Sequence, residues 1–146
     1  MKLVELTRRG FLKLSLALSG GVTLVGMFKF LSYETAPKII TRVTLDDPDS
    51  YASGSVIPVP EAQVWLLRDD DGLYALSSVC THLGCNIRST GEEFECPCHG
   101  SRFDLKGAVL QGPAISALRY VELSRSPENL LVVDTKVNVP ATQRLN

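Results

Sequence analysis

The pattern of apolar and polar positions divides the chain into an apolar N-terminal run and a longer region of short alternating segments. Residues 14–28 carry no charge, and after Lys29 the apolar run continues to Leu31. A helix over 14–28 reaches about 22 Å, short of the ~30 Å hydrocarbon core of a bilayer. Extended to Leu31, with Lys29 snorkelling to the interface, the run approaches spanning length. The pattern predicts one membrane-spanning helix within residues 1–31.

Beyond the apolar run the pattern indicates β-structure, because short β-branched segments alternate with turns rich in Gly, Pro and Asp. No helical period of useful length follows residue 32. Asp69-Asp70-Asp71-Gly72 and Lys106-Gly107 are hairpin turn signals. Eight or nine short strands predict an all-β sandwich or barrel. The clearest expected strands are 39–45, 64–68, 73–77, the two arms of 103–110, 119–123 and 130–133.

The chain length then bounds the domain organisation. Residues 32–38 read as a short linker, and residues 39–146 are enough for one domain with a modest core. The polar tail after Asp134 is expected either to be loose or to dock on a partner.

The N-terminal charges suggest export. Residues 7–13, Thr-Arg-Arg-Gly-Phe-Leu-Lys, match a twin-arginine signal, and no convincing small-x-small cleavage site follows. We therefore expect an uncleaved signal that stays as an anchor, although Gly20, Gly21 and Gly26 would also suit a signal that is removed or a helix that packs closely against a neighbour.

The segment before the apolar run has a net charge of +3, whereas residues 34–146 hold fifteen acidic and ten basic residues. The positive-inside rule then places the globular part on the outer face of a bacterial-type membrane, and nothing suggests nucleic-acid binding.

All four cysteines and both histidines fall in two short boxes, Cys80–Cys85 (CTHLGC) and Cys96–Ser101 (CPCHGS). The spacing C-x-H-x13-C-x2-H offers two thiolates and two imidazoles, which suit either one zinc ion or the two irons of a 2Fe–2S cluster. Zinc sites more often pair Cys with Cys and His with His. Each box also holds one further cysteine, which leaves open a disulfide between the loops.

These boxes resemble the cluster-binding motifs of the Rieske iron–sulfur proteins, specifically the disulfide-containing kind of cytochrome bc-type quinol oxidoreductases. The resemblance extends through Phe103–Gly107 and Gly112–Ala114 and covers roughly residues 74–123. It implies one 2Fe–2S cluster and a Rieske fold, in which an antiparallel β base carries a small cluster-binding subdomain at roughly residues 78–114.

The resemblance also implies roles for individual residues. His99 is the histidine expected to hydrogen-bond quinol, with His82 beside it, so these two are the candidate catalytic residues. The implied set is Cys80 and Cys96 on the inner iron, His82 and His99 on the outer iron, Ser101 as a hydroxyl donor to a bridging sulfide, and a Cys85–Cys98 disulfide.

Two positions depart from the family pattern. Phe103 stands where high-potential relatives carry a tyrosine, so the ring is kept and a hydrogen-bond donor to a cysteine sulfur is lost. We expect a reduction potential below that of the serine-plus-tyrosine proteins and above that of ferredoxin-type centres. Ile115 follows Ala114 where the family often has a second proline, which changes the apolar rim expected from Leu83 and residues 112–114.

The resulting hypothesis is an electron-transfer subunit that takes an electron and a proton from quinol and passes the electron to a cytochrome. Its expected partners are a cytochrome b-type membrane subunit and a c-type cytochrome or equivalent acceptor. The alternative is the small Rieske subunit of an exported molybdoenzyme such as arsenite oxidase. Zinc, a pair of structural disulfides and a ferredoxin-type Rieske domain are further interpretations of the same residues.

Overall fold

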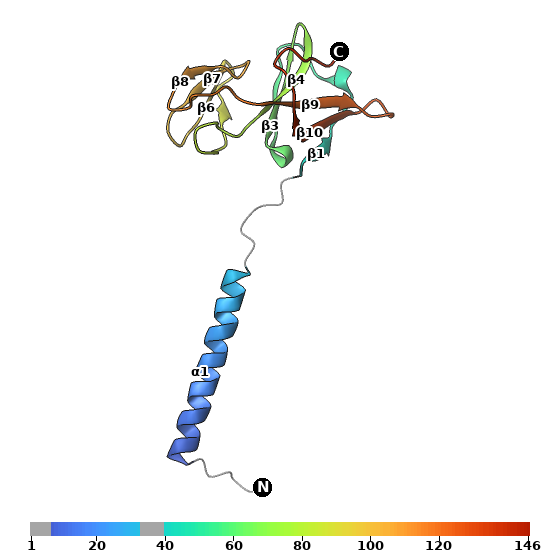
Figure 1. Cartoon of the computed structure of the whole chain (residues 1–146). Helices are drawn as coiled ribbons and strands as arrows, with labels where there is room; N and C mark the ends of the chain where they lie inside the picture. The colour runs from blue at the N-terminus through green and yellow to red at the C-terminus, as the bar shows by residue number, and fades with distance from the viewer. Residues whose placement is uncertain (1–6, 33–39) are drawn as a thin grey trace. The chain divides into compact units, whose positions relative to one another are not determined.

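A computed structural model of the chain describes residues 7–32 and 40–146, which form two separate units, a helix and a β-sheet unit (Figure 1). The predicted linker, residues 32–38, lies outside the described residues apart from Ser32. Within the described part of the chain the prediction of an all-β globular region with one N-terminal apolar helix is confirmed.

The helix α1 spans Arg8–Leu31, and the Thr7 hydroxyl caps its N-terminus by accepting a hydrogen bond from the Gly10 N–H at 3.2 Å. Its 24 residues correspond to about 36 Å at 1.5 Å per residue. The mean hydropathy of its most apolar stretch is 1.6, and none of its residues is buried. The helix is therefore long and apolar enough to cross a membrane, and it is longer than the apolar run alone because it begins at Arg8.

The base of the β unit is a six-stranded antiparallel sheet with the order β1-β10-β9-β4-β3-β2. The predicted hairpin at Asp69–Gly72 is confirmed, because β3 and β4 pair through Asp69 and Gly72 with only two residues between them. Strand β2 was not predicted, since Pro58 interrupts its apolar pattern; the proline is tolerated because β2 lies at the sheet edge. The elements of this part are β1 Arg42–Thr44, the 3-10 turns Pro48–Ser50 and Pro60–Ala62, β2 Val56–Val59, β3 Val64–Asp69, β4 Gly72–Ser77, β9 Tyr120–Arg125 and β10 Leu131–Asn138.

Strand β4 is buried along its whole length because it lies between two hydrophobic cores. Alternate side chains of a strand point to opposite faces. Leu73 and Ala75 enter the core on one face, whereas Tyr74 and Leu76 enter the core on the other, which also contains both free cysteines. The base sheet thus supports the cysteine boxes directly.

The second sheet has four antiparallel strands in sequential order, β5 Arg88–Ser89, β6 Glu93–Glu95, β7 Arg102–Asp104 and β8 Val109–Gln111. It consists of a short hairpin between the two boxes and the predicted hairpin at Lys106-Gly107. Figure 1 shows β6–β8 at one end of the β unit and β3, β4, β9 and β10 at the other. No strand pairing joins the two sheets in residues 40–146.

The C-terminal tail packs against the base sheet. Strand β10 runs to Asn138, and Leu145 then forms an antiparallel bridge with Leu73 through N–H···O bonds of 2.8 and 2.9 Å. Gly72 is needed at this point, because a Cβ there would collide with the Asn146 side chain and the Leu145 carbonyl. The expectation of a loose tail is therefore wrong, because the tail docks on its own chain, whereas docking on a partner stays a prediction.

Candidate metal centre

The two boxes fold into loops with the same backbone. In Cys80–Cys85 and in Cys96–Ser101, the first residue's N–H donates to the sixth residue's carbonyl at 2.8 Å. The first residue's carbonyl accepts from the N–H of the fifth residue, Gly84 or Gly100, at 3.0 Å. Both glycines have positive φ, 79° and 74°, a region that residues with a Cβ rarely adopt. The shared geometry explains why both boxes need glycine as their fifth residue.

The first residue of each loop is a buried, free cysteine. Cys80 and Cys96 are 3% and 2% exposed. Burial raises the pKa of the Cys80 thiol, whose sulfur lies within hydrogen-bonding reach of the Cys96 thiol and the Ser101 hydroxyl. The sequence-predicted inner pair of ligands therefore lies together in the core.

The two histidines lie together on the outer side. Their ring centroids are 4.9 Å apart and the ring planes are perpendicular, at 88°. His82 is half-buried, and its Nδ1 is buried without a hydrogen-bond partner among the described residues. His99 is exposed. An unpaired buried nitrogen is costly unless it binds something, so Nδ1 of His82 is a candidate ligand atom.

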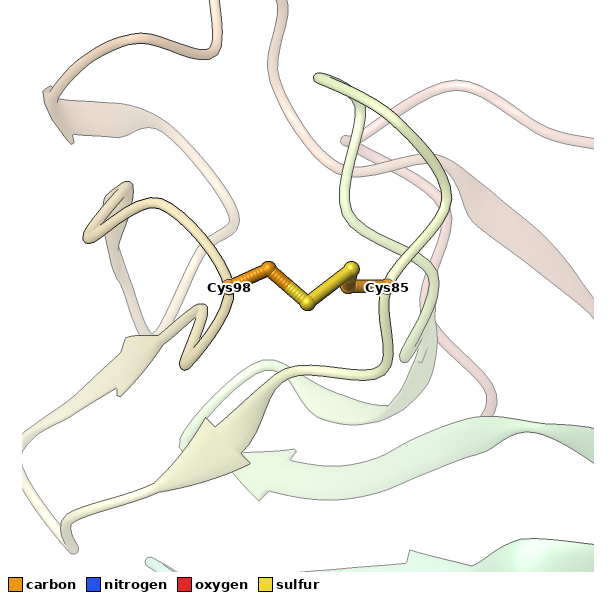
Figure 2. Close-up of a disulfide and its surroundings, with 2 residues drawn as sticks. All are labelled: Cys85 and Cys98. Carbon is orange, nitrogen blue, oxygen red and sulfur yellow. A yellow bond between two sulfur atoms is a disulfide. The ribbon is translucent and has the colours of Figure 1, made fainter.

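A disulfide joins Cys85 to Cys98 and ties one loop to the other (Figure 2). The two Cα atoms are 6.5 Å apart. The Cys96 sulfur lies within 4.8 Å of both disulfide sulfurs, so these three sulfurs form a compact group. Since Cys85 and Cys98 are bonded to each other, neither offers a thiolate to a metal, and Cys96 remains the free thiol of the group.

Ser101 is completely buried beside the cysteines. Its Oγ accepts a hydrogen bond from the Ala114 N–H at 3.0 Å, which leaves its own proton free to be donated toward the Cys80 sulfur. The loop that carries Ala114 is held by Thr81, whose Oγ1 donates to the Ser116 carbonyl at 2.6 Å. Sequence reasoning missed the contributions of Thr81 and Ala114, because neither residue type alone indicates a contact with the other loop.

Phe103 lies in the same core on β7, opposite Phe94 on β6, and is 0% exposed. Phe94 in turn packs against Trp65 of the base sheet, with ring centroids 5.3 Å apart. The ring at position 103 therefore serves the packing of the subdomain core and supplies no hydrogen-bond donor.

The first box and the loop that carries Ala114 each have one exposed aliphatic side chain. Leu83 is 70% exposed and Ile115 is 94% exposed, whereas Ala114 is buried. Of the predicted rim of Leu83 and residues 112–114, only Ala114 is buried, because it turns inward to Ser101, whereas Ile115 after it is exposed.

Known proteins share this sequence pattern. The chain is 26% identical over 141 residues to the cytochrome b6-f complex iron-sulfur subunit of Chlorobaculum thiosulfatiphilum, covering 90% of this chain and 78% of that one. It is 39% identical over 71 residues to the subunit of the same name from Synechococcus sp. strain WH7803, covering 46% of this chain and 40% of that one. The chain spans less than half the length of most of the curated relatives that it matches.

Among solved structures, the cyanobacterial plasma membrane Rieske protein of Synechocystis is 31% identical with a TM-score of 0.43, covering 54% of this chain and 83% of that one. A chain of a hyperthermophilic respiratory Complex III is 23% identical with a TM-score of 0.48, covering 80% and 94%. The sequence profile of the Rieske [2Fe-2S] domain matches residues 43–133, well over half of the chain. The chain therefore belongs to the Rieske [2Fe-2S] domain family.

Proposed function

We propose that Cys80 and Cys96 hold one iron of the cluster and that His82 and His99 hold the other. The residues fit a Rieske centre, in which two histidines replace two cysteines on one of the two irons. The thiols are buried and free, and the two histidine rings, one from each loop, lie edge to face with their centroids 4.9 Å apart. The observation that best supports this assignment is the buried Nδ1 of His82, which has no hydrogen-bond partner among the described residues. A nitrogen that binds a metal needs no other partner.

The cluster supplies a one-electron acceptor whose potential in such centres spans roughly −150 to +300 mV. The protein adjusts that potential through its hydrogen bonds to sulfur. The Ser101 hydroxyl is free to donate, which stabilises added negative charge, whereas Phe103 has no donor. We therefore expect an intermediate potential, suited to a low-potential quinol such as menaquinol.

The histidines give this site a second capacity, the handling of a proton. If Nδ1 of His82 binds iron, its Nε2 is the nitrogen that carries a proton, and we assign the same arrangement to His99. His99 is exposed and is the candidate for the hydrogen bond to quinol, with His82 beside it. The exposed Leu83 and Ile115 provide an apolar border suited to a membrane-embedded partner.

We infer that the chain is the electron-transfer subunit of a membrane quinol–cytochrome oxidoreductase and is not catalytic alone. It would accept an electron and a proton from quinol at a site shared with a cytochrome b-type subunit and pass the electron to a c-type cytochrome or equivalent. Support comes from the relatives named cytochrome b6-f complex iron-sulfur subunit, one of which matches 90% of the chain.

The proposed domain organisation follows from the helix. Residues 1–31 would act as a twin-arginine signal retained as an anchor, residues 32–38 as a linker and residues 39–146 as the Rieske domain, with its cluster-binding subdomain at about 78–114. Helix α1 is long enough to span a bilayer. The positive charge before it and the acidic globular region favour a domain on the outer face.

The test is an EPR-monitored redox titration of the full-length protein at two pH values on either side of neutral. A Rieske-type signal with a positive potential that falls as pH rises is the expected result, because reduction is then coupled to histidine protonation. A low potential independent of pH would instead identify a ferredoxin-like carrier. Stable association with a large soluble subunit and a cleaved signal would favour the molybdoenzyme alternative.

A further inference from the structure

The turn between β7 and β8 is fastened to the base sheet by side chains that lie outside the two boxes. The Tyr74 hydroxyl donates to the Leu105 carbonyl at 3.0 Å, and the Tyr120 hydroxyl donates to the Lys106 carbonyl at 2.8 Å. A third bond runs from the Leu118 N–H to the Gly107 carbonyl at 2.8 Å. Since no strand pairing joins the two sheets in residues 40–146, these bonds are direct polar links between them.

The two tyrosines are themselves held by one arginine of the C-terminal tail. Their rings stack with centroids 5.7 Å apart, and the Arg144 guanidinium carbon lies 4.0 Å from the Tyr74 centroid and 5.8 Å from the Tyr120 centroid. The face of an aromatic ring attracts a cation at such distances. Arg144 therefore contacts the pair of rings and restricts their movement.

Arg144 is in turn fully bound in place. Its Nε donates to Oδ1 and Oδ2 of Asp69 at 3.2 and 3.0 Å, and its Nη2 donates to Oδ2 at 3.0 Å. Its Nη1 donates to the carbonyls of Ala141 and Gln143 at 2.7 and 3.0 Å. Its side chain is only 12% exposed. Burial alone would raise the pKa of Asp69, but the hydrogen bonds and charge of Arg144 outweigh burial and hold that pKa below its ordinary value. A largely buried arginine–carboxylate pair of this kind is geometrically specific.

The fastened turn is one end of a strand whose other end lies at the metal centre. Strand β7 runs from Arg102 to Asp104, directly between Ser101 and the turn, and it pairs on both sides, with β6 and β8. Tyr74, Tyr120, Phe103 and the two free cysteines share one hydrophobic core. Because packed cores transmit small displacements, a shift of the turn would move Ser101 relative to the cysteines.

We propose that Arg144 is a positioning residue for the iron–sulfur site: it holds Tyr74 and Tyr120 so that their hydroxyls fix the β7–β8 turn and thereby the Ser101 hydroxyl. The proposal rests on the cluster assignment made above. Tyr74 and Tyr120 lie within the part of the chain that matches the family, residues 43–133, but Arg144 lies beyond it. The tail thus adds a support for the site that the family match does not include.

The experiment compares full-length holoproteins with Arg144→Ala, with Tyr74→Phe, with both substitutions, and with Arg119→Ala as the matched control. Arg119 is an exposed arginine next to Tyr120. The reduction potential and the hydrogen exchange of the Lys106 and Ala108 amides are measured for each. We expect a lower potential and about fivefold to tenfold faster exchange in Arg144→Ala and Tyr74→Phe, as for the loss of one hydrogen bond, and no change in Arg119→Ala.

The double variant decides between positioning and general stability. Because Arg144 acts partly through Tyr74 and partly through Tyr120, the double variant should shift the potential by less than the sum of the two single changes. Additive shifts, or a potential that stays at the wild-type value in Arg144→Ala, would overturn the proposal even if the unfolding midpoint fell. Should Arg144→Ala not fold, Tyr74→Phe keeps the ring in the core and tests the same link. A wild-type protein without a Rieske-type EPR signal would instead defeat the proposed function.

Discussion

The Ser101 hydroxyl oxygen and the Ala114 N–H form a 3.0 Å hydrogen bond inside the core, between the second box and the loop that covers it. The Ser101 oxygen accepts this bond, so its own proton stays free to be donated, and the Cys80 sulfur lies within reach. Through this bond, the backbone of the covering loop helps to position a hydroxyl group beside the proposed cluster.

Replacing Ser101 with Ala should lower the reduction potential, because the reduced cluster loses a donor. A hydrogen bond to a charged group is worth about 1.5–3 kcal/mol, and roughly 59 mV corresponds to a tenfold change for one electron, so a drop on the order of 60–130 mV is expected. Voltammetry of Ser101→Ala against wild type measures it. Ser101→Thr, which keeps the hydroxyl, is the control, and equal potentials in Ala and wild type would refute the assigned donor.

Replacing Phe103 with Tyr should raise the potential. The ring is buried on β7 beside the free cysteines, and tyrosine would add a hydroxyl where the chain has none. The matched control is Phe94→Tyr on the facing strand, which adds the same group to the same core. A potential that stays constant in Phe103→Tyr would remove the explanation offered for the intermediate value.

Removing the Cys85–Cys98 disulfide should destabilise the holoprotein, because the bond ties the two box loops together across a sequence separation of 13. Closing a loop of this size stabilises by about 3 kcal/mol in the chain-entropy model. The double substitution Cys85→Ser with Cys98→Ser should unfold at lower denaturant concentration and lose its visible absorption sooner. If the denaturant midpoints of unfolding and of the loss of visible absorption both match those of wild type, the disulfide has no structural role.

Tyr74 should make the fold sensitive to alkali. Burial and, secondarily, the charge of Asp69 raise the pKa of Tyr74 to about 12. Because this pKa is higher in the folded protein, the contribution of the neutral Tyr74 hydroxyl to stability is intact below the unfolded pKa of about 10. It is lost as pH rises from there toward about 12. Across this pH range the free energy of unfolding, measured by denaturant titration, should therefore fall less in Tyr74→Phe than in wild type. Parallel pH profiles for the two proteins would contradict the assignment.

The boxes show how much of the site a local sequence pattern predicts. All cysteines and histidines lie within residues 80–99, so their clustering, and the glycine at the fifth place of each loop, follow from the sequence. The hairpin at Asp69–Gly72 was predictable for the same reason, because turn chemistry acts between neighbouring residues. The apolar helix and the all-β class rest on periodicity, which is also local.

Contacts between distant segments were not predictable in this way. That Ala114 faces inward and Ile115 outward depends on the Ser101 bond, and the attachment of Thr81 to Ser116 depends on how two loops meet. Arg144 reads as an ordinary tail residue until the tail returns to β4 and places it over Tyr74. The sequence by itself determined the kind of chemistry, because the types and the spacing of the cysteines and histidines in the two boxes are properties of the sequence. Only the tertiary structure decided which groups support that chemistry, because packing brings together residues far apart in sequence.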